Sequence, residues 1–410
     1  METGLILLGC ALAALALHPF STYPLSLALL ARLRPRPLAP IAPAATAAGP
    51  NPPNRPDRVA LCICAYNEAG VIRAKAENML AMRAATPGLE LLIYVDGTSD
   101  ATAEILAEYE DRITVIASPT RHGKTHGMNT LIERSGAELI VFSDANVMFA
   151  PDAIPRLLRP FADPGVGCVC GHLIYTGPDN NPTGATGSLY WRLEERIKEL
   201  ESRTGSIMGA DGSIFAIRRA LHSPPPRDVI DDMYVSLSLL CDGHRVVRAG
   251  DALALEALVS RPAEEFRRKV RIGCQAFNVH RMLRSRLRRL GPLNRYKYVS
   301  HKLLRWFTGY LLVAAAALLS AGLALAEAWW LLGFGLAALA SLAAAARLRP
   351  AGAAACALDV LSAFLATGLG VLRSMRGDRF QTWTPPASAR ALVDPSIGGI
   401  SNAAHTAQSQ

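Results

Sequence analysis

Charged side chains are absent from three long stretches of this chain of 410 residues. The stretches run from Glu2 to Arg32, from Thr308 to Ala326, and from Ala328 to Ala346, with no formal charge inside them. Each is near or above the roughly 20 apolar residues that a helix needs to cross a bilayer. With half of its residues hydrophobic, the composition favours a membrane part over a wholly soluble protein.

The first apolar stretch lacks the features of a cleaved signal peptide. It begins with an acidic residue, Glu2, and it ends in arginines from Arg32 onward instead of at a small-residue cleavage site. We therefore expect residues 1–36 to be a retained transmembrane anchor, kinked at Pro19 and Pro24. Because the arginines follow the apolar stretch, the positive-inside rule puts the residues after it in the cytoplasm.

Cysteine pairs with metal-binding spacing are also absent. Cys62 and Cys64, like Cys168 and Cys170, are two residues apart inside apolar runs. Such positions are typical of small core residues in a reduced compartment. The sequence therefore predicts neither a disulfide framework nor a zinc site.

Acidic side chains are scarce in one block near the second apolar stretch. Residues 261–305 hold fourteen Lys and Arg against Glu264 and Glu265, a local charge of +12 in a chain of net charge +9. Apolar residues interleave with these cations, which predicts interfacial helices over 261–307 that rest on anionic membrane lipids. Nothing else in the chain supports nucleic-acid binding, so no nucleic-acid partner is predicted.

Between the anchor and the basic block, strand patterns alternate with helix patterns. A Pro/Ala-rich linker over 37–57 comes first. The alternation predicts an α/β domain over 58–260 with a mostly parallel sheet and helices on both faces. Strands are expected at 58–64, 89–95, 113–117, 139–143, 166–174 and 213–218, and helices at 69–82, 101–109, 187–202 and 228–240.

Three acidic residues come at the ends of predicted strands. They are Glu68, Asp96 and Asp144, and ligands of parallel sheets bind beyond the carboxyl ends of the strands. Asn146 follows Asp144 by two residues, and a carboxylate with a second oxygen donor suits a hard divalent cation shared with substrate phosphates. Turns and helix caps use Asp and Asn as well, so this triplet alone leaves both interpretations open.

A loop rich in cations, histidine and glycine is expected at 118–129. Arg121 and Lys124 supply positive charge, and the glycines let the backbone approach closely, as a phosphate or nucleotide site requires. A solvated basic loop is the alternative. The spacing is not that of a P-loop, so an ATPase is disfavoured.

Six short polar motifs occur in order at these strand ends and loops. The set resembles the motifs of membrane-bound family-2 glycosyltransferases, relatives of the cellulose, chitin and hyaluronan synthases with a GT-A catalytic domain, over roughly residues 58–310. The resemblance implies a GT-A fold and hexosyl transfer from a nucleotide-sugar donor. The motifs are Tyr66-Asn67-Glu68, Asp96-Gly97-Thr98-Ser99-Asp100, Arg121-His122-Gly123-Lys124, Asp144-Ala145-Asn146, Gly209-Ala210-Asp211-Gly212 and Asp231-Asp232.

The resemblance implies that the first three motifs bind the donor. Glu68 and Asp96 would contact the uridine of a UDP-sugar, with Tyr66 in the same site, because carboxylates accept hydrogen bonds from base N–H and ribose hydroxyl groups. Lys124 and Arg121 would approach the nucleotide or its diphosphate.

The fourth motif would hold a metal ion. Asp144 would bind Mg²⁺ or Mn²⁺ that bridges the diphosphate, with Asn146 where many relatives have a second Asp. Such a cation stabilises the charge that develops when the sugar–phosphate bond breaks. Because Asn146 removes one negative charge, low metal affinity without substrate is expected.

The last two motifs would face the acceptor. Asp232 aligns with the family's general base, with Asp231 in reserve, and a base that acts opposite the leaving group inverts the anomeric carbon. Asp228 or Asp231 could instead cap the following helix. Asp211 would face the acceptor sugar or serve as a turn residue beside Gly212.

One motif of polymerising relatives, Gln-x-x-Arg-Trp, is missing. The stretch 268–272 reads Arg-Lys-Val-Arg-Ile, so Arg271 would still meet the diphosphate but the stacking ring is absent. Transfer to a lipid or short saccharide acceptor is therefore favoured over a processive polysaccharide synthase. A membrane-tethered nucleotide-binding scaffold without turnover is the third alternative.

The C-terminal part predicts a multi-pass protein of a bacterial inner membrane with a cytoplasmic catalytic domain. A transmembrane region is expected over 308–373 and a cytosolic tail over 374–410, disordered from about 393. The last apolar stretch, 351–372, contains Asp359, and it either spans, is re-entrant or lies in the interface. A resemblance of 380–385 to a cytosolic tryptophan motif favours an inside tail.

Overall fold

The computed structural model describes residues 1–37, 58–176, 182–257, 262–349 and 352–382. Almost all of the predicted linker and most of the predicted tail, including Trp383, lie outside this part of the chain. The contacts divide the chain into two compact units. The sheet unit comprises Pro35–Gly177, Glu201–Val259 and Phe380–Gln410, and the helical unit comprises Met1–Arg34, Pro178–Leu200 and Ser260–Arg379.

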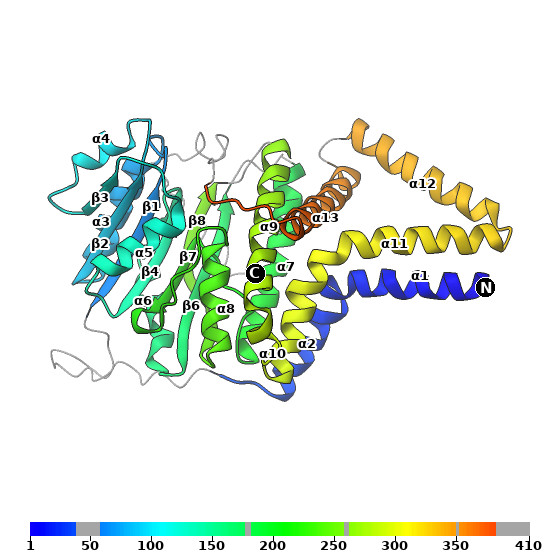
Figure 1. Cartoon of the computed structure of the whole chain (residues 1–410), viewed down its shortest axis with the longest axis horizontal. Coiled ribbons are helices and arrows are strands. Elements are labelled where there is room, and N and C mark those ends of the chain that lie inside the picture. Colours follow the sequence, from blue (N-terminus) through cyan, green and yellow to red (C-terminus); the bar gives the residue numbers. More distant parts are fainter. Residues whose placement is uncertain (38–57, 177–181, 258–261, 350–351, 383–410) are drawn as a thin grey trace. The chain divides into compact units, whose positions relative to one another are not determined.

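The sheet unit is built on one eight-stranded sheet, in the order β3-β2-β1-β4-β7-β6-β8-β5 (Figure 1). Strands β3, β2, β1 and β4 run parallel. Beyond β4 the sheet is mixed, because β7 is antiparallel to β4 and β6, and β5 is antiparallel to β8. The strands are β1 (Val59–Ala65), β2 (Leu89–Asp96), β3 (Thr114–Ser118), β4 (Leu139–Asp144), β5 (Val147–Phe149), β6 (Val166–Thr176), β7 (Ile214–Arg218) and β8 (Arg245–Ala257).

Continuous apolar sequence explains the centre of this sheet. Every residue of β1 is buried, as expected for a parallel strand covered on both faces. The two cysteines of β1 and the two of β6 are buried, which confirms that they are core residues. The helices of this unit are α3 (Ile72–Ala85), α4 (Thr102–Ala107), α5 (Lys124–Arg134), α6 (Ala153–Leu158) and α8 (Asp231–Cys241).

The α/β class is confirmed, and three details differ from the sequence-based expectation. The segment predicted as a loop over 118–129 is helical from Lys124 onward, because α5 begins there. Strands β5 and β8 and the short helix α6 were not predicted. The long strand β8 contains Gly250, Asp251 and Glu256, residues that strand propensities disfavour.

The helical unit contains four helices that are long and apolar enough to cross a membrane. Their described bounds are Glu2–Phe20, Pro292–Leu325, Trp329–Leu348 and Ala353–Met375. The first of them ends in a 3₁₀ turn, His18–Phe20, which contains Pro19 and lies between α1 and α2, where a proline kink was expected. The helices are α1 (Glu2–Leu17), α2 (Thr22–Leu33), α7 (Pro182–Arg203), α9 (Pro262–Leu287), α10 (Pro292–Tyr298), α11 (Leu304–Leu325), α12 (Trp329–Leu348) and α13 (Ala353–Met375).

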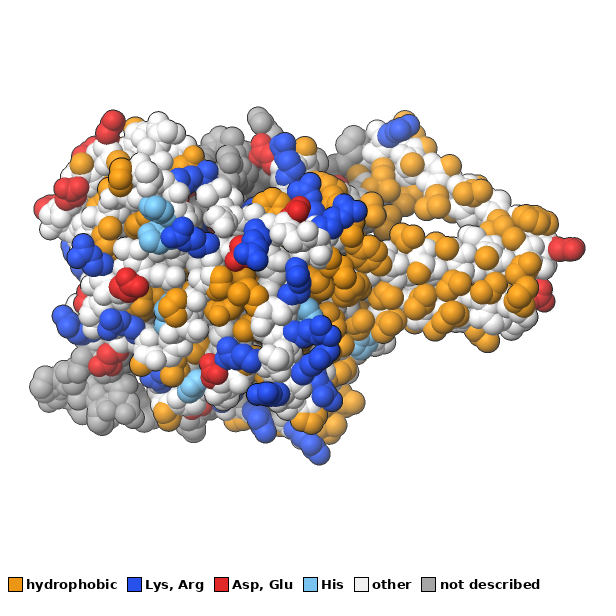
Figure 2. All heavy atoms as spheres, in the orientation of Figure 1, with side chains coloured by type: hydrophobic (Ala, Val, Ile, Leu, Met, Phe, Trp, Pro, Cys, Tyr) orange, Lys and Arg blue, Asp and Glu red, His pale blue; other side chains and the backbone are white. Residues whose placement is uncertain are grey.

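Small residues bring helices of this unit close together. A side chain at Gly9 of α1 would lie 2.7 Å from Leu319 of α11, and one at Gly370 of α13 would lie 2.5 Å from the Val270 carbonyl oxygen of α9. Such contacts are common between membrane helices. Figure 2 shows hydrophobic side chains on the outer surface of α11 and α12, where Trp330 and Phe334 are more than 70% exposed.

The last apolar helix, α13, is unbroken. It spans 23 residues with Asp359 inside it, and this length is enough to cross a bilayer.

Candidate active site

Three strands bring acidic residues to the same edge of the sheet. Asp96 is the last residue of β2 and Asp144 the last of β4, while Glu68 lies three residues after β1. These strands are parallel neighbours, so their carboxyl ends meet, and Cys64 of β1 pairs in register with Asp144. Glu68 and Asp96 are buried. The loops at this edge are where ligands of such sheets bind.

Asp96 fixes the loop that leads into α5. Its Oδ1 accepts a hydrogen bond from the His122 backbone N–H at 2.7 Å, and its Oδ2 accepts one from the Gly123 N–H at 2.8 Å. Gly123 has φ +95°, a conformation that glycine tolerates best. The Gln381 carbonyl oxygen lies 2.5 Å from where its Cβ would be. In this structure Asp96 is a positioning residue, and its contact with a nucleoside stays a prediction.

Two further contacts order the loops around the expected nucleotide site. The Arg121 guanidinium lies over the Tyr66 ring, 3.6 Å from its centroid. Asn67 has φ +53°, and its Oδ1 accepts a hydrogen bond from the Ser99 N–H at 2.9 Å. The loops after β1 and β2 are therefore joined, while the Arg121 guanidinium contacts an aromatic ring instead of extending into solvent.

Lys124 connects two of the predicted site acids. Its Nζ lies 2.7 Å from Asp144 Oδ1 and 3.4 Å from Asp231 Oδ2. Although burial opposes the charge, Asp144 and Asp231 hold the pKa of Lys124 well above its usual value. In the structure the ammonium group of Lys124 lies between two carboxylates. Its approach to a diphosphate stays a prediction.

The predicted base lies beside this ion pair. Asp232 is in the first turn of α8, where the helix dipole favours a carboxylate. Its Oδ2 lies 2.8 Å from the position of a Cβ on Gly212, and Lys124 Nζ lies 3.6 Å from the same position. Burial, together with the charge of Asp231, raises the pKa of Asp232 to about 7. A carboxylate with such a pKa suits proton abstraction near neutral pH.

Asp231 and Asp211, together with Asp144 and Asp232, make up what we call the acidic group. Asp231 is 7% exposed, and its Oδ2 is buried without a hydrogen-bond partner. It belongs to helix α8, whose N-cap is Ile230, so neither acid of the pair is the N-cap residue. Asp211 Oδ1 accepts a hydrogen bond from the Ser213 N–H at 3.1 Å, the turn role that the sequence left open.

Two residues that the sequence did not single out support the turn after β4. Lys75 of α3 is fully buried, and its Nζ donates to Ser143 Oγ at 3.1 Å and to the Val147 carbonyl oxygen. Glu256 of β8 accepts a hydrogen bond from Asn146 Nδ2 at 3.1 Å. The helical pattern of the sequence does not show that Lys75 is buried. Nothing in the sequence around Glu256 indicates its role, because strand β8 was not predicted.

Arg271 lies on α9 in the helical unit. There its Nη1 donates a hydrogen bond to Gln275 Oε1 at 3.1 Å. Its approach to the donor diphosphate stays a prediction.

The acidic group fits a divalent cation in its chemistry. No group of three or more His, Cys, Asp or Glu in the described ranges is arranged as a complete metal site. Asp144 and Asn146 offer a carboxylate and an amide oxygen, and Mg²⁺ or Mn²⁺ sites often take their remaining ligands from substrate phosphates and water. Asp231 Oδ2 is buried without a hydrogen-bond partner, and the Lys124 ammonium group lies 3.4 Å from it.

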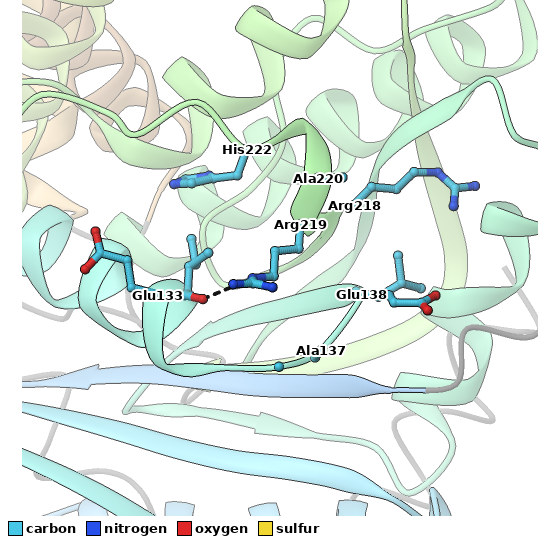
Figure 3. A pocket seen from close by; sticks show the side chains of 10 residues that line it. Glu133, Ala137, Glu138, Arg218, Arg219, Ala220 and His222 are labelled. Carbon is cyan, nitrogen blue, oxygen red and sulfur yellow. Dashed lines mark hydrogen bonds between the residues drawn. The ribbon is translucent and has the colours of Figure 1, made fainter.

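A hollow of about 550 Å³ lies elsewhere on the sheet unit (Figure 3). It is lined by Leu139, at the start of β4, and by Arg218, at the end of β7, whereas Asp144 lies at the opposite end of β4. Arg219 Nε donates a hydrogen bond to the Ile132 carbonyl oxygen there at 3.2 Å. This hollow is therefore separate from the acidic group.

Comparison with known proteins places this site in a family. Residues 60–223 match the family model "Glycosyl transferase family 2". An N-acetylglucosaminyltransferase of Rhizobium sp. (strain N33) is 25% identical over 257 residues, 58% of this chain and 56% of the relative. A hyaluronan synthase of Streptococcus pyogenes is 29% identical over 177 residues, 41% and 42% of the two chains. The chain thus spans about half the length of these curated relatives.

A solved structure has the same fold over most of the chain. The mannosyltransferase PcManGT from Pyrobaculum calidifontis, in complex with GDP-Man and Mn²⁺, superposes with a TM-score of 0.68. The match covers 92% of this chain and 100% of that one at 22% identity. The order of motifs, the sheet and these matches agree: residues 60–223 match the family-2 glycosyltransferases, the fold is GT-A, and four helices of the described part of the chain are apolar enough to span a membrane.

Proposed function

We propose that this chain is an inverting hexosyltransferase that moves a sugar from a nucleotide-sugar, with UDP as the nucleotide, to a hydroxyl group of a lipid or saccharide acceptor at a membrane. One observation carries the proposal. Lys124 joins Asp144 and Asp231, and Gly212 brings Asp232 beside them. Carboxylates for the donor end and for the acceptor end thus converge at the carboxyl edge of the sheet.

Each of these residues has a proposed task. Asp232 takes the proton from the acceptor hydroxyl as it attacks the anomeric carbon, on the side opposite the leaving diphosphate. Asp144 and Asn146 would hold Mg²⁺ or Mn²⁺, which supplies electrostatic stabilisation to the leaving diphosphate when bound. Glu68, Asp96 and their loops shape the nucleoside site.

The helical unit supports the proposed acceptor and cellular location. Four apolar helices and the basic residues of α9 and α10 support a multi-pass protein of a bacterial inner membrane with its sheet unit in the cytoplasm. An acceptor held at the membrane, such as a lipid-linked saccharide, would reach this enzyme without diffusing through water.

Donor binding and turnover test the proposal separately. Purified full chain in detergent with Mn²⁺ is screened against UDP-sugars and GDP-sugars for thermal stabilisation, because a bound ligand raises the unfolding temperature by mass action. The stabilising donor is then assayed for nucleotide release. We expect Asp232→Asn to keep the stabilisation and lose the release. Normal release by Asp232→Asn would show that the assigned base is wrong.

Product length separates single transfer from processive synthesis. A hyaluronan synthase is among the relatives, so a polymer is the second candidate. Incubation with radiolabelled donor and membrane lipid extract is expected to give a short, discrete product on a gel. A long ladder would instead support a polysaccharide synthase.

A further inference from the structure

Glu256 contacts Asn146, the residue that stands where many relatives have a second Asp. Its Oε1 accepts a hydrogen bond from Asn146 Nδ2 at 3.1 Å, and its Oε2 accepts one from Ser213 Oγ at 3.3 Å. The contact is built into the sheet, because Val147 of β5 pairs in register with Glu256 of β8. The carboxylate of β8 is thereby held next to the turn that carries Asp144 and Asn146.

The contact determines which way the Asn146 amide faces. An ionised carboxylate only accepts hydrogen bonds, whereas an amide has one accepting and one donating end. The NH₂ group of Asn146 must therefore face Glu256, and its Oδ1 is directed to another side. A flexible Asn would otherwise present either end to a ligand.

The same contact supplies negative charge. Asn146 is neutral where many relatives have Asp, so the Asp144-Ala145-Asn146 turn carries one carboxylate. A charged acceptor on the amide NH₂ polarises the amide and makes its oxygen a better ligand, as groups behind metal ligands commonly do. Asn146 lacks the negative charge of an Asp, and the Glu256 carboxylate is hydrogen-bonded directly to Asn146.

We propose that Glu256 is a positioning residue of the candidate metal site: it directs the Asn146 oxygen toward the bound cation and supplies the negative charge that Asn146 lacks. This inference rests on the proposed function, because it requires that a divalent cation binds at Asp144. It assigns part of the metal affinity to β8, a strand far along the chain from the motif.

A swap of the two side chains tests the inference. The variants are Glu256→Gln, Asn146→Asp and the double variant with both changes, each as purified full chain in detergent. Asn146→Asp alone puts two carboxylates in contact, and Glu256→Gln alone removes the charge and leaves the amide orientation unfixed. The double variant restores one carboxylate hydrogen-bonded to one amide.

Mn²⁺ affinity without nucleotide is the readout, measured from the electron paramagnetic resonance signal of free Mn²⁺. We expect Glu256→Gln to weaken Mn²⁺ binding about tenfold, and the double variant to return to within about threefold of the wild type. If the double variant loses as much affinity as Glu256→Gln alone, or more, the inference is wrong. Thermal midpoints without metal identify any misfolded single variant, and in that case recovery of both fold and affinity in the double variant still decides.

A further variant separates this inference from the proposed function. Asp144→Asn is expected to abolish Mn²⁺ binding. If it does so while residues 146 and 256 act independently, only the role of Glu256 is wrong. If Asp144→Asn binds Mn²⁺ as the wild type does, the metal site of the proposed function fails, and the role of Glu256 fails with it.

Discussion

Lys124 Nζ lies 2.7 Å from Asp144 Oδ1 and 3.4 Å from Asp231 Oδ2, so one ammonium group links the end of β4 to the start of α8. It holds a place beside Asp144 that a divalent cation would compete for. The charge of Lys124 therefore offsets part of the negative charge of these two carboxylates.

Replacing this lysine is expected to change metal binding and stability in opposite directions. Lys124→Met leaves carboxylates uncompensated, which lowers the thermal midpoint of the metal-free protein, and it removes a competing cation, so Mn²⁺ binds about tenfold more tightly. Calorimetric titration and thermal unfolding measure both effects. The control is Lys198→Met, a buried lysine paired with Glu195 at 2.9 Å in the helical unit. Unchanged Mn²⁺ affinity in Lys124→Met would contradict the competition.

A methyl group at position 212 should displace the base. In Gly212→Ala the new Cβ would lie 2.8 Å from Asp232 Oδ2, so the carboxylate must move. A displacement of about 1 Å costs up to ~100-fold in rate. Nucleotide release is measured together with donor-induced thermal stabilisation, which should persist. The control is Gly136→Ala, whose Cβ would meet only the end of the Arg58 side chain. Equal release by both variants would argue against Asp232 as the base.

Asp96 should matter for the loop before α5. Asp96→Asn replaces one of two accepting oxygens by an NH₂ donor that faces a backbone N–H, which we expect to cost about 1–3 kcal/mol of unfolding free energy. Donor affinity should fall as well, since the loop carries Lys124 at its end. Denaturant unfolding checks the first effect and thermal stabilisation by donor the second. Glu108→Gln, which breaks a surface ion pair with Arg73, should change stability by less than about 1 kcal/mol.

If Asp232 abstracts the proton, the rate of nucleotide release should fall at acidic pH. The pKa of this group is raised to about 7, so below that pH it is protonated and cannot act as a base. Nucleotide release should fall as pH drops below 7, while donor binding persists. The pH dependence of stability runs in the opposite direction to that of nucleotide release. The folded state holds this proton more tightly than the unfolded state, so the free energy of unfolding falls as pH rises from about 4 to 7. In Asp232→Asn this contribution to the pH dependence of unfolding should vanish.

Lys75 should also make the stability of the protein depend on pH. Burial lowers the pKa of Lys75 to about 7, against an opposing effect of Asp144. The unfolded state therefore binds the proton more tightly, and the wild type should gain stability between pH 7 and about 10, by at most ~1.4 kcal/mol per pH unit. Lys75→Met should lack this gain and weaken nucleotide release, since it loses the bonds to Ser143 and Val147. Arg73→Met, at an exposed position of the same helix, is the control.

The parallel half of the sheet could be predicted because its signals are local. An apolar run such as 59–65 followed by polar residues identifies a strand and its ligand-binding end. The second half gave weaker signals. Strand β8 contains Asp251 and Glu256, and its partners β5 and β6 lie far from it in sequence. Pairing over such distances leaves no periodic pattern to recognise.

In the candidate site, too, some features could be predicted from the sequence and others could not. Asp144, Asp231 and Asp232 could be named from motifs, because short polar segments at strand ends are visible in the sequence. The contacts between them could not. Lys124 was expected to approach a diphosphate, whereas the structure pairs its charge with Asp144 and Asp231. Lys75 and Glu256 act through tertiary contacts alone.

The close approach of α1 to α11 at Gly9 and Leu319 has a consequence for biosynthesis. Translation produces α1 first and α11 only after every strand of the sheet has left the ribosome. The first helix is therefore made long before its packing partner and lacks that partner while the strands of the sheet are synthesised. Packing of α1 against α11 is then a late event, and a nascent chain that stops before residue 304 would leave the face of α1 around Gly9 uncovered.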